Sequence, residues 1–416
     1  MLAEGDPEAA LVALGTADRS AAACHLAGLA EAELGRISRA TARFRAAVAA
    51  DPDQAAGWSN LGMMLKIAGR HDEAIAAHDS AVARAPEDAQ IRVNRAVALL
   101  HAGRWEAAWG EYEWRLRLPG HASLPLDRLM PALAVAGDLA GRRILLTHEE
   151  GFGDTLQFAR YAAPLIARGA AVTLAVPAPL RRLLAPLAPV LAPGAPLPEH
   201  DWHCPFFSLP RVFATTPGTV PASVPYLRAD PALAARWAAR LGPRDGRLRV
   251  GLVWAGQARP WLDGFATLDA RRSARLADFA PLGAVPGLRC VSLQAGPKAA
   301  QAGAPPPGLA LEDPMAEVAD FADTAAIVSQ LDAVVSVDTA MVHLAGALGV
   351  TVLMLDRLDH CWRWLPGRAD SPWYPGMRIF RQTRLGDWRA PMRGVARAVA
   401  ALREGRGVTG PRVTGP

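Results

Sequence analysis

The segment "HEEGFGDTLQFARY", from His148 to Tyr161, combines features that suit anion binding with one that does not. It follows an apolar run that ends at Thr147 and leads into a predicted helix. A glycine turn between a strand and a helix is a common phosphate site, because free N–H groups and the helix dipole favour negative charge there. Asp154 lies in this turn, and its carboxylate would repel a phosphate. The aspartate therefore needs a different chemical role or a purely structural one.

Dinucleotide binding is the first function that such glycines could indicate, and the sequence excludes it. The phosphate fingerprint needs a third glycine where the helix starts, and this chain has Leu156 at that position. It also needs an acidic residue at the end of the second strand, where the chain reads Ala175-Val176-Pro177-Ala178. The sequence contains no Walker phosphate-binding loop either. We therefore exclude an NAD- or FAD-binding fold.

A second segment, "VVSVDTAMVHLAGALGVTVLML", reads as strand, polar cap, helix, glycine and strand. Asp338 or Thr339 is predicted to cap the helix. The N–H groups of Thr339, Ala340 and Met341 would then lie at its positive end, which is a ready anion site. The preceding predicted helix opens in the same way, with Asp323 as its cap. Plain capping is the alternative interpretation of both openings.

From Arg142 onward, short apolar strands alternate with helices. The predicted strands are Ile144–Thr147, Ala171–Val176, Arg249–Trp254, Leu288–Leu293, Ala333–Val337 and Val350–Leu355. The predicted helices are Thr155–Ala167, Leu180–Leu187, Ala232–Arg240, Thr324–Leu331 and Thr339–Leu348. This alternation predicts parallel sheets covered by helices, and its restart at Leu248 predicts two such domains. A ligand would bind at the carboxyl ends of the strands, in the cleft between the domains.

The N-terminal third has an internal repeat with a period of 34 residues. Three copies place a glycine at the same turn, an alanine at the same point of the second helix, and a large residue four positions later. These residues are Gly35, Gly69 and Gly103, then Ala40, Ala74 and Ala108, then Phe44, His78 and Tyr112. This is the tetratricopeptide pattern of helix–turn–helix units. Such an array offers a concave surface for a protein or peptide, or it merely braces the neighbouring domain; His78 is read as packing.

Length and composition limit the classes of protein to which the chain can belong. Its 416 residues suit two or three domains, and the net charge of +5 comes without the Lys/Arg clusters of a nucleic-acid-binding protein. No pair of cysteines has metal-ligand or redox spacing; they are Cys24, Cys204, Cys290 and Cys361. No apolar run approaches the length of a membrane span. We expect a cytoplasmic protein with reduced thiols, no membrane span and no nucleic-acid partner.

Six segments resemble one family in sequence and in order. They are "GFGDTLQFARY", "VGLVWAG", "ARRSARLADFAPL", "VSLQAG", "DFADTAAIV" and "VSVDTAMVHLAGALG". The chain resembles bacterial tetratricopeptide-repeat glycosyltransferases, whose catalytic half is similar to the heptosyltransferases of glycosyltransferase family 9. Its plan is also similar to that of the O-linked N-acetylglucosamine transferases. The resemblance covers essentially the whole chain.

The resemblance implies a GT-B fold, in which two Rossmann-like α/β domains follow the repeats. We expect tetratricopeptide repeats in residues 1–122, with three full repeats and one partial repeat, and a linker over 123–141. An acceptor domain would span 142–240 and a donor domain 241–404, followed by a disordered tail, 405–416. The implied activity is inverting, metal-independent transfer from a nucleotide sugar to a protein or glycan acceptor that the repeats recruit. Neither candidate site contains an Asp-x-Asp metal motif.

By the same resemblance, Asp154 is the general base that takes a proton from the acceptor hydroxyl. The two glycines of its turn would let the backbone approach the sugar. The alternative is that Asp154 only caps a helix that begins at Thr155. The implied substrate-binding residues are Gly151, Gly153, Gln157, Arg259, Arg272, Ser273, Gln294, Asp338, Thr339, Ala340, Met341 and His343. For His343 the alternative is a core histidine.

The chain departs from the family after "VWAG", where members usually carry Asn-Pro and a lysine. Here Gln257-Ala258-Arg259-Pro260 stands instead. An arginine can replace a phosphate-binding lysine but points its charge differently. His360-Cys361 is a second departure, before a tryptophan pair, Trp362 and Trp364, that we read as packing. A repeat protein whose GT-B unit has lost activity and serves as a binding scaffold is therefore the rival hypothesis.

Overall fold

The structure is a computed structural model that describes residues 6–15, 19–121, 124–257 and 265–405. Its contacts divide the chain into two compact units. The first comprises Met1–Leu124 with two later segments, Ala214–Gly218 and Asp359–Pro366. The second comprises Pro125–Phe213, Thr219–Leu358 and Gly367–Pro416.

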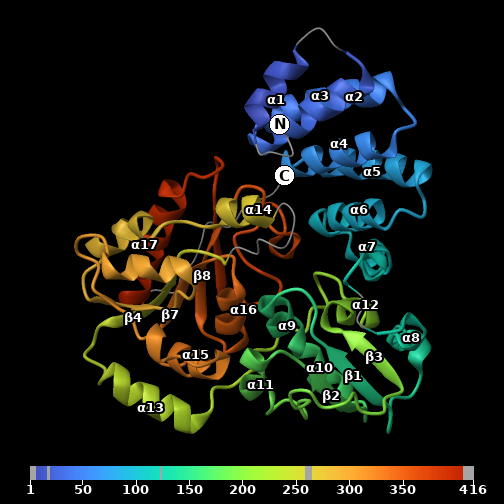
Figure 1. Ribbon diagram of the computed structural model, residues 1–416. Helices are drawn as coiled ribbons and strands as arrows, with labels where there is room; N and C mark the ends of the chain where they lie inside the picture. Colours follow the sequence, from blue (N-terminus) through green and yellow to red (C-terminus); the bar gives the residue numbers. More distant parts are fainter. Residues whose placement is uncertain (1–5, 16–18, 122–123, 258–264, 406–416) are drawn as a thin grey trace. The chain divides into compact units, whose positions relative to one another are not determined.

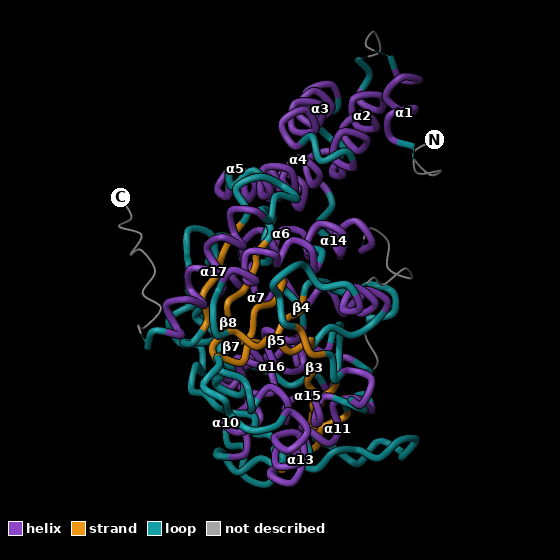
Figure 2. The backbone as a smooth tube through the Cα atoms, turned by 90° about the vertical axis from the view of Figure 1, so that its left-hand side faces the viewer, coloured by secondary structure: helices purple, strands orange, loops and turns teal. Residues whose placement is uncertain are grey.

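The first unit is built from antiparallel helix pairs. Its helices are α1 (Pro7–Leu14), α2 (Ala21–Glu33), α3 (Ile37–Ala50), α4 (Ala55–Ile67), α5 (His71–Arg84), α6 (Ala89–His101) and α7 (Trp105–Tyr112), followed by the 3-10 turn Glu113–Arg117. In Figure 2 these elements are purple, and among the described residues no strand precedes Arg143. The expected helical repeats are therefore present, with α1 standing alone as half of a further pair.

Small residues and glycine turns set the helix pairs of the repeats. Gly35, Gly69 and Gly103 have φ of 70°, 76° and 74°, the left-handed conformation that ends a helix at low cost for glycine. Elsewhere a glycine faces a large ring: a Cβ on Gly62 would lie 2.7 Å from the His78 ring. Gly28 faces Phe44 at the same separation. His78 is 1% exposed, so it packs between the helices, as expected.

Aromatic side chains pack the last repeat against two later segments of the same unit. Trp105 and Trp109 both lie edge-on to Trp362, with ring centroids 5.7 and 5.5 Å apart. The Trp109 Nε1–H donates to the carbonyl oxygen of Thr215 at 2.6 Å. Trp362 and Trp364 are buried, which confirms that they pack in a core. The two later segments of this unit thus complete the repeat core.

The second unit contains two parallel sheets (Figure 1). The smaller has the order β2-β1-β3, with β1 (Arg143–Thr147), β2 (Ala171–Ala175) and β3 (Trp202–Pro205). The larger has the order β6-β5-β4-β7-β8-β9. Its strands are β4 (Leu248–Val253), β5 (Leu288–Ser292), β6 (Leu311–Glu312), β7 (Ala333–Val337), β8 (Thr351–Asp356) and β9 (Met377–Arg381). In chain order this is 3-2-1-4-5-6, the doubly wound arrangement, and it places the crevice for a ligand between β4 and β7.

Helices cover the larger sheet on both faces. Val250, Val335 and Leu353 point into one core with Met392 and Val395 of α17 (Arg389–Arg403). Helix α16 (Ala340–Ala347) packs on β7 and β8 with residues outside this core. The other helices of the unit are α8 (Leu133–Ala136), α9 (Phe152–Phe158), α10 (Ala162–Ile166), α11 (Ala178–Leu184), α12 (Leu209–Val212), α13 (Pro231–Leu241), α14 (Phe265–Arg272) and α15 (Phe321–Val328).

Two helix starts differ from the predictions. The helix expected from Thr155 begins at Phe152 and is broken by a 3-10 turn, Ala159–Tyr161, before α10. Helix α15 is capped by Asp320, whose side chain accepts from the N–H groups of Ala322 and Asp323. Asp323 therefore does not cap that helix. It is 2% exposed and accepts from the Trp237 Nε1–H at 3.0 Å, tying α15 to α13.

Candidate functional site

Asp154 lies in the first turn of α9, at the carboxyl end of β1. Its Oδ2 accepts from the backbone N–H of Gly151 at 2.9 Å, so the side chain reaches back over the start of the helix. His148 and Thr155 are linked beside it, with Nδ1 and Oγ1 2.7 Å apart. Asp154 does make a capping contact, but from inside the helix rather than in front of Thr155. Its side chain is only partly buried, so an incoming hydroxyl could reach it.

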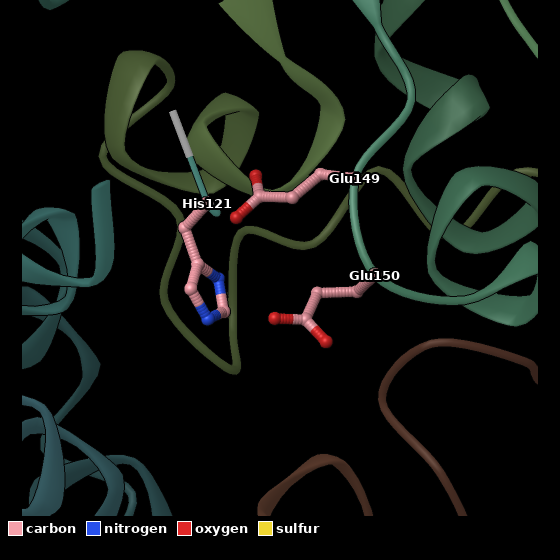
Figure 3. Close-up of side chains that lie close together, drawn as sticks. All are labelled: His121, Glu149 and Glu150. Atoms are coloured by element: carbon pink, nitrogen blue, oxygen red, sulfur yellow. The ribbon is translucent and has the colours of Figure 1, made fainter. Parts of the chain in front are cut away.

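Two glutamates precede the turn, and the sequence reasoning passed over both. Figure 3 labels Glu149 and Glu150, which are consecutive and lie one residue beyond the end of β1. Glu149 is 8% exposed. Glu150 is exposed and has φ of 62°, a left-handed conformation that costs a residue with a Cβ on the order of 1–3 kcal/mol. The loop before Asp154 therefore contains one strained backbone position and two acidic side chains.

Gly153 brings this turn against the helix of the other sheet. A Cβ on Gly153 would lie 2.9 Å from Cδ2 of His343 and 3.2 Å from Cα of Ala340. Helices α9 and α16 pack together, and Figure 1 shows them side by side. Gly153 therefore meets a packing requirement in this structure, and its expected role in the approach of a sugar stays a prediction. Gly151 is the N-cap of α9, with an ordinary φ of −111°.

The start of α16 has the predicted form, with Thr339 as the cap. Its Oγ1 accepts from the Met341 N–H at 3.3 Å and lies 3.2 Å from Ser336 Oγ. Asp338 and Ala340 are partly buried, whereas Met341 is 8% exposed. The first turn of α16 therefore faces the crevice with its positive end.

His343 is a buried histidine. It is 5% exposed, and its Nδ1 lies 2.9 Å from the hydroxyl oxygen of Tyr374. Burial raises the pKa of the Tyr374 phenol well above its usual range, so the hydroxyl keeps its proton. The contact with the Tyr374 hydroxyl agrees with the core alternative for His343, and contact with a donor stays a prediction.

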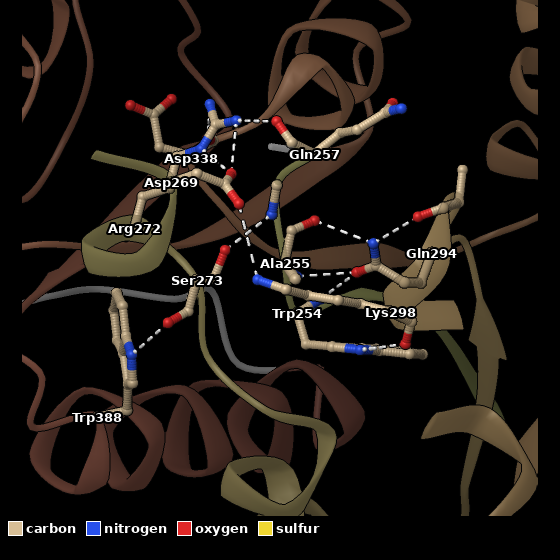
Figure 4. Close-up of polar contacts among 12 residues, drawn as sticks. Trp254, Ala255, Gln257, Asp269, Arg272, Ser273, Gln294, Lys298, Asp338 and Trp388 are labelled. Atoms are coloured by element: carbon tan, nitrogen blue, oxygen red, sulfur yellow. Dashed lines mark hydrogen bonds and ion pairs between the residues drawn. The ribbon is translucent and has the colours of Figure 1, made fainter. Parts of the chain in front are cut away.

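Arg272 and Ser273 join the loop after β4 to α16 (Figure 4). The Arg272 guanidinium donates to Asp269 Oδ1 from Nε at 3.0 Å, and its Nη1 lies 3.5 Å from the carbonyl oxygen of Asp338. Ser273 Oγ accepts from the Gly256 N–H at 3.1 Å. A Cβ on Gly256 would lie 2.4 Å from both Arg272 and Asp269, so a larger residue there would displace this ion pair. Both predicted residues therefore lie at the crevice between β4 and β7.

Of the two predicted glutamines, Gln294 is held by hydrogen bonds within the protein, and Gln157 is buried. Gln294 Oε1 accepts from the N–H groups of Trp254 and Ala255, at 3.0 and 2.8 Å. Its Nε2 donates to the carbonyl oxygens of Ala255 and Ala295. Gln157 has no exposed surface. The Gln294 amide is therefore fully used within the protein and shapes the site, whereas Gln157 lies in the core; contact of either glutamine with a ligand stays a prediction. Arg259 lies outside the described residues.

A pocket of about 660 Å³ opens beside this crevice. Its walls come from the ends of β5 and β6, from the loops that follow them, and from the starts of α15 and α16. They include Leu293, Gly296, Met315, Phe321 and Met341. The volume is in the range of small-molecule and cofactor sites. The sequence predicted a ligand at this edge of the sheet but not this pocket.

A buried arginine ties the two sheets together, and nothing in the sequence pattern predicted it. Arg160 is 3% exposed, and its guanidinium lies 4.7 and 4.8 Å from the ring centres of Tyr226 and Tyr374. It donates to the carbonyl oxygens of Gln157 and Trp373, both at 2.8 Å. Cation–π and charged hydrogen bonds of this kind are strong when desolvated. This network connects the end of α9 to the residues that hold His343.

A second buried group outside the predictions is Asp356, at the end of β8. The side chain has no exposed surface, and Arg381 Nε donates to its Oδ2 at 2.8 Å. Burial raises the pKa of this carboxyl to about 7, against the opposing effect of Arg381. Asp356 therefore titrates near neutral pH, which the sequence alone did not indicate.

The chain is thus a helical-repeat protein joined to a parallel-sheet α/β unit that contains a pocket of about 660 Å³. Residues 25–82 and 68–113 match the family model described as tetratricopeptide repeat, which confirms the repeats. Protein FlbA of Caulobacter vibrioides is 28% identical over 435 residues, which cover 88% of this chain and 70% of FlbA. Among the described residues, no helix combines the length and apolar character needed to cross a membrane.

Two solved structures are similar to this chain at low identity. E. coli ADP-heptose lps heptosyltransferase II shares 14% identity and a TM-score of 0.46, covering 63% of this chain and 99% of its own. An O-GlcNAc transferase of Thermobaculum terrenum shares 18% identity and a TM-score of 0.32, covering 96% of this chain and 88% of its own. Likeness at this level does not assign an activity, which has to come from the residues of the site.

Proposed function

We propose that the second unit is an inverting, metal-independent glycosyltransferase of GT-B architecture. In this proposal residues 142–240 form the acceptor domain and residues 241–404 the donor domain, each Rossmann-like. The donor is a nucleotide sugar, and the acceptor is a protein or a glycan. One observation supports the proposal: Gly153 packs on Ala340 of α16, so that the adjacent Asp154 lies near the N-terminal end of that helix.

The donor would occupy the pocket and the crevice together. The largely apolar pocket next to Met341 suits a nucleoside. The diphosphate would then lie over the N–H groups of Thr339, Ala340 and Met341, where the helix dipole favours negative charge. Arg272, 3.5 Å from the Asp338 carbonyl oxygen, would add a guanidinium at the same place. Asp338 itself would position the sugar or its phosphate.

Transfer would proceed in one displacement. Asp154 takes the proton of the acceptor hydroxyl as its oxygen forms a bond to the anomeric carbon of the donor sugar. The bond from that carbon to the diphosphate breaks on the opposite face, and the nucleoside diphosphate leaves with the electron pair. The helix N–H groups and Arg272 stabilise the developing charge. Attack from the face opposite the leaving group inverts the configuration.

The repeats would recruit the acceptor. Tetratricopeptide arrays form concave surfaces that bind protein segments, and residues 25–113 match that family model. A bracing role remains the alternative for this short array. If the repeats bind the acceptor, substitutions on their concave surface should raise KM for a macromolecular acceptor. The same substitutions should leave kcat for a small acceptor sugar unchanged.

Binding of the donor is the first test. A panel of nucleoside diphosphates should raise the melting temperature, because a ligand that binds only the folded state stabilises it. The stabilisation should persist after a chelator is added, since neither candidate site contains an Asp-x-Asp metal motif. Loss of the stabilisation with chelator would refute the metal-independent mechanism.

Asp154→Asn is the test of chemistry. Asparagine keeps an oxygen that can accept the Gly151 N–H bond, so folding and donor affinity should stay near those of the wild type. Transfer should fall about 100- to 10,000-fold, the usual contribution of a positioned base. Asp338→Asn should weaken donor binding as well as turnover. A wild-type protein that binds nucleoside diphosphates but transfers no sugar to any acceptor would favour the inactive scaffold, which the altered loop after Gly256 supports.

A further inference from the structure

The second unit contains a single lysine, and it lies beside the crevice. The whole chain has two lysines, Lys66 and Lys298, among 45 basic Lys and Arg residues. Arginine serves at almost every other basic position, including the surface ion pairs. A lysine differs from arginine by a compact ammonium with three rotatable donors, which suits a point contact to phosphate. Lys298 therefore merits a specific explanation.

The backbone around Lys298 is fixed against the donor site. Its carbonyl oxygen accepts from the Trp254 Nε1–H at 3.1 Å, at the end of β4. Gly296 and Ala299, which flank it, line the pocket. The Lys298 side chain is 38% exposed, so the ammonium is open to a ligand.

Asp269 holds Lys298 and Arg272 close together (Figure 4). Its side chain is 3% exposed, and its Oδ1 accepts from Arg272 while its Oδ2 lies 3.7 Å from Lys298 Nζ. At 3.7 Å the lysine pair is longer than a hydrogen bond, so the ammonium donors stay available. Two cations share this one carboxylate, so the trio carries a net positive charge at the crevice.

We infer that Lys298 binds the diphosphate of the donor together with Arg272, and that Asp269 positions both cations. The inference rests on the proposed function. Arg272 reaches the start of α16, and Lys298 approaches from the β5 side of the pocket. An anion between the pocket and α16 would therefore meet helix N–H groups and two cations from two separate elements. Lys298 is a binding residue in this account and takes no part in proton transfer.

The test compares Lys298→Gln with Lys66→Gln, a matched change in the repeats. Calorimetric titration would use the nucleoside diphosphate that stabilises the wild type most, and the corresponding nucleoside. Lys298→Gln should raise Kd for the diphosphate about 10- to 100-fold, the worth of one charge-assisted hydrogen bond. Kd for the nucleoside should not change, because it carries no phosphate. Lys298→Arg should recover only part of the affinity, because the guanidinium keeps the charge but places its donors differently. Lys66→Gln should match the wild type.

Amine labelling of the wild-type protein gives an independent readout that needs no variant to fold. Only two lysine side chains can react. The diphosphate should slow modification of Lys298, and the nucleoside should not; modification of Lys66 should be unaffected by either, as mass spectrometry can show. Equal labelling rates at Lys298, with a diphosphate Kd for Lys298→Gln within about threefold of the wild type, would overturn the inference and leave the proposed function standing. A wild-type protein that binds no nucleoside diphosphate would overturn both.

Discussion

Gly153→Ala tests whether the contact between α9 and α16 sets the geometry of the site. The added Cβ would lie 2.9 Å from Cδ2 of His343 and 3.2 Å from Cα of Ala340. The His343 ring has little freedom to move, because it is 5% exposed and bonded to Tyr374. Ala340 is backbone at that point and cannot rotate away. The two helices must therefore separate by some tenths of an ångström or more.

Two opposing effects decide the stability of Gly153→Ala. Overpacking of a tight contact costs about 1–3 kcal/mol. Alanine in place of glycine within a helix returns about 0.5–1 kcal/mol. We expect a net loss of about 1–2 kcal/mol, which is small enough for the variant to fold. Activity should suffer more, since a displacement of about 1 Å at a reacting group can cost about 100-fold in rate.

Gly110→Ala is the matched control for this change. Gly110 lies in helix α7, and a Cβ built there meets no atom within 4 Å. That variant should be as stable as the wild type or more stable, by about 0.5–1 kcal/mol, with unchanged transfer. Chemical denaturation and a transfer assay under saturating donor would measure both. Full activity and undiminished stability in Gly153→Ala would refute the view that α9 and α16 fix the position of Asp154.

Two pH profiles follow from buried groups. Burial lowers the pKa of His78 to about 3, so the unfolded chain takes up a proton first as the pH falls. The repeats should then lose about 2 kcal/mol between pH 6.5 and pH 5, and His78→Phe, which would repeat the pairing of Phe44 with Gly28, should abolish this loss in pH-dependent denaturation. For Asp356 the folded pKa is raised to about 7, so the folded state holds a proton that the unfolded state releases. Stability should fall as the pH rises from about 4 to about 7; Asp356→Asn should flatten that slope, and an unchanged slope would show that Asp356 does not titrate there.

The parts of the fold that the sequence predicted are those with a local cause. Strand β7 occupies Ala333–Val337, as predicted, because a central parallel strand buried on both faces is a continuous apolar run. The glycines of the repeats mark turns that need a left-handed backbone. Thr339 caps α16 because its side chain can accept from the Met341 N–H. Each of these features depends on residues a few positions apart.

The missed features depend on residues far apart or on short edge elements. Strand β3 (Trp202–Pro205) ends in a proline within a proline-rich stretch, and β9 (Met377–Arg381) carries two arginines and lies at the edge of its sheet. Both depend on a neighbouring strand for their conformation. The site contacts of Arg160 join positions separated by 66 and 213 residues, a relation that no spacing rule reveals. Burial likewise raised the pKa of Asp356 without any local pattern.

The glycine turn after β1 serves helix packing and, in the proposed reaction, the position of the base. Gly153 must be glycine because α16 leaves no room for a Cβ, and the next residue is the carboxylate. A base on a flexible loop would lose its geometry with each movement of that loop, whereas a base on a packed helix keeps it. The close contact therefore fixes the separation between Asp154 and the start of α16 by helix packing. In the proposed reaction that separation sets the distance between the proton acceptor and the nucleotide-sugar donor. Gly153 and Asp154 therefore contribute to one function, Gly153 through packing and Asp154 through its carboxylate.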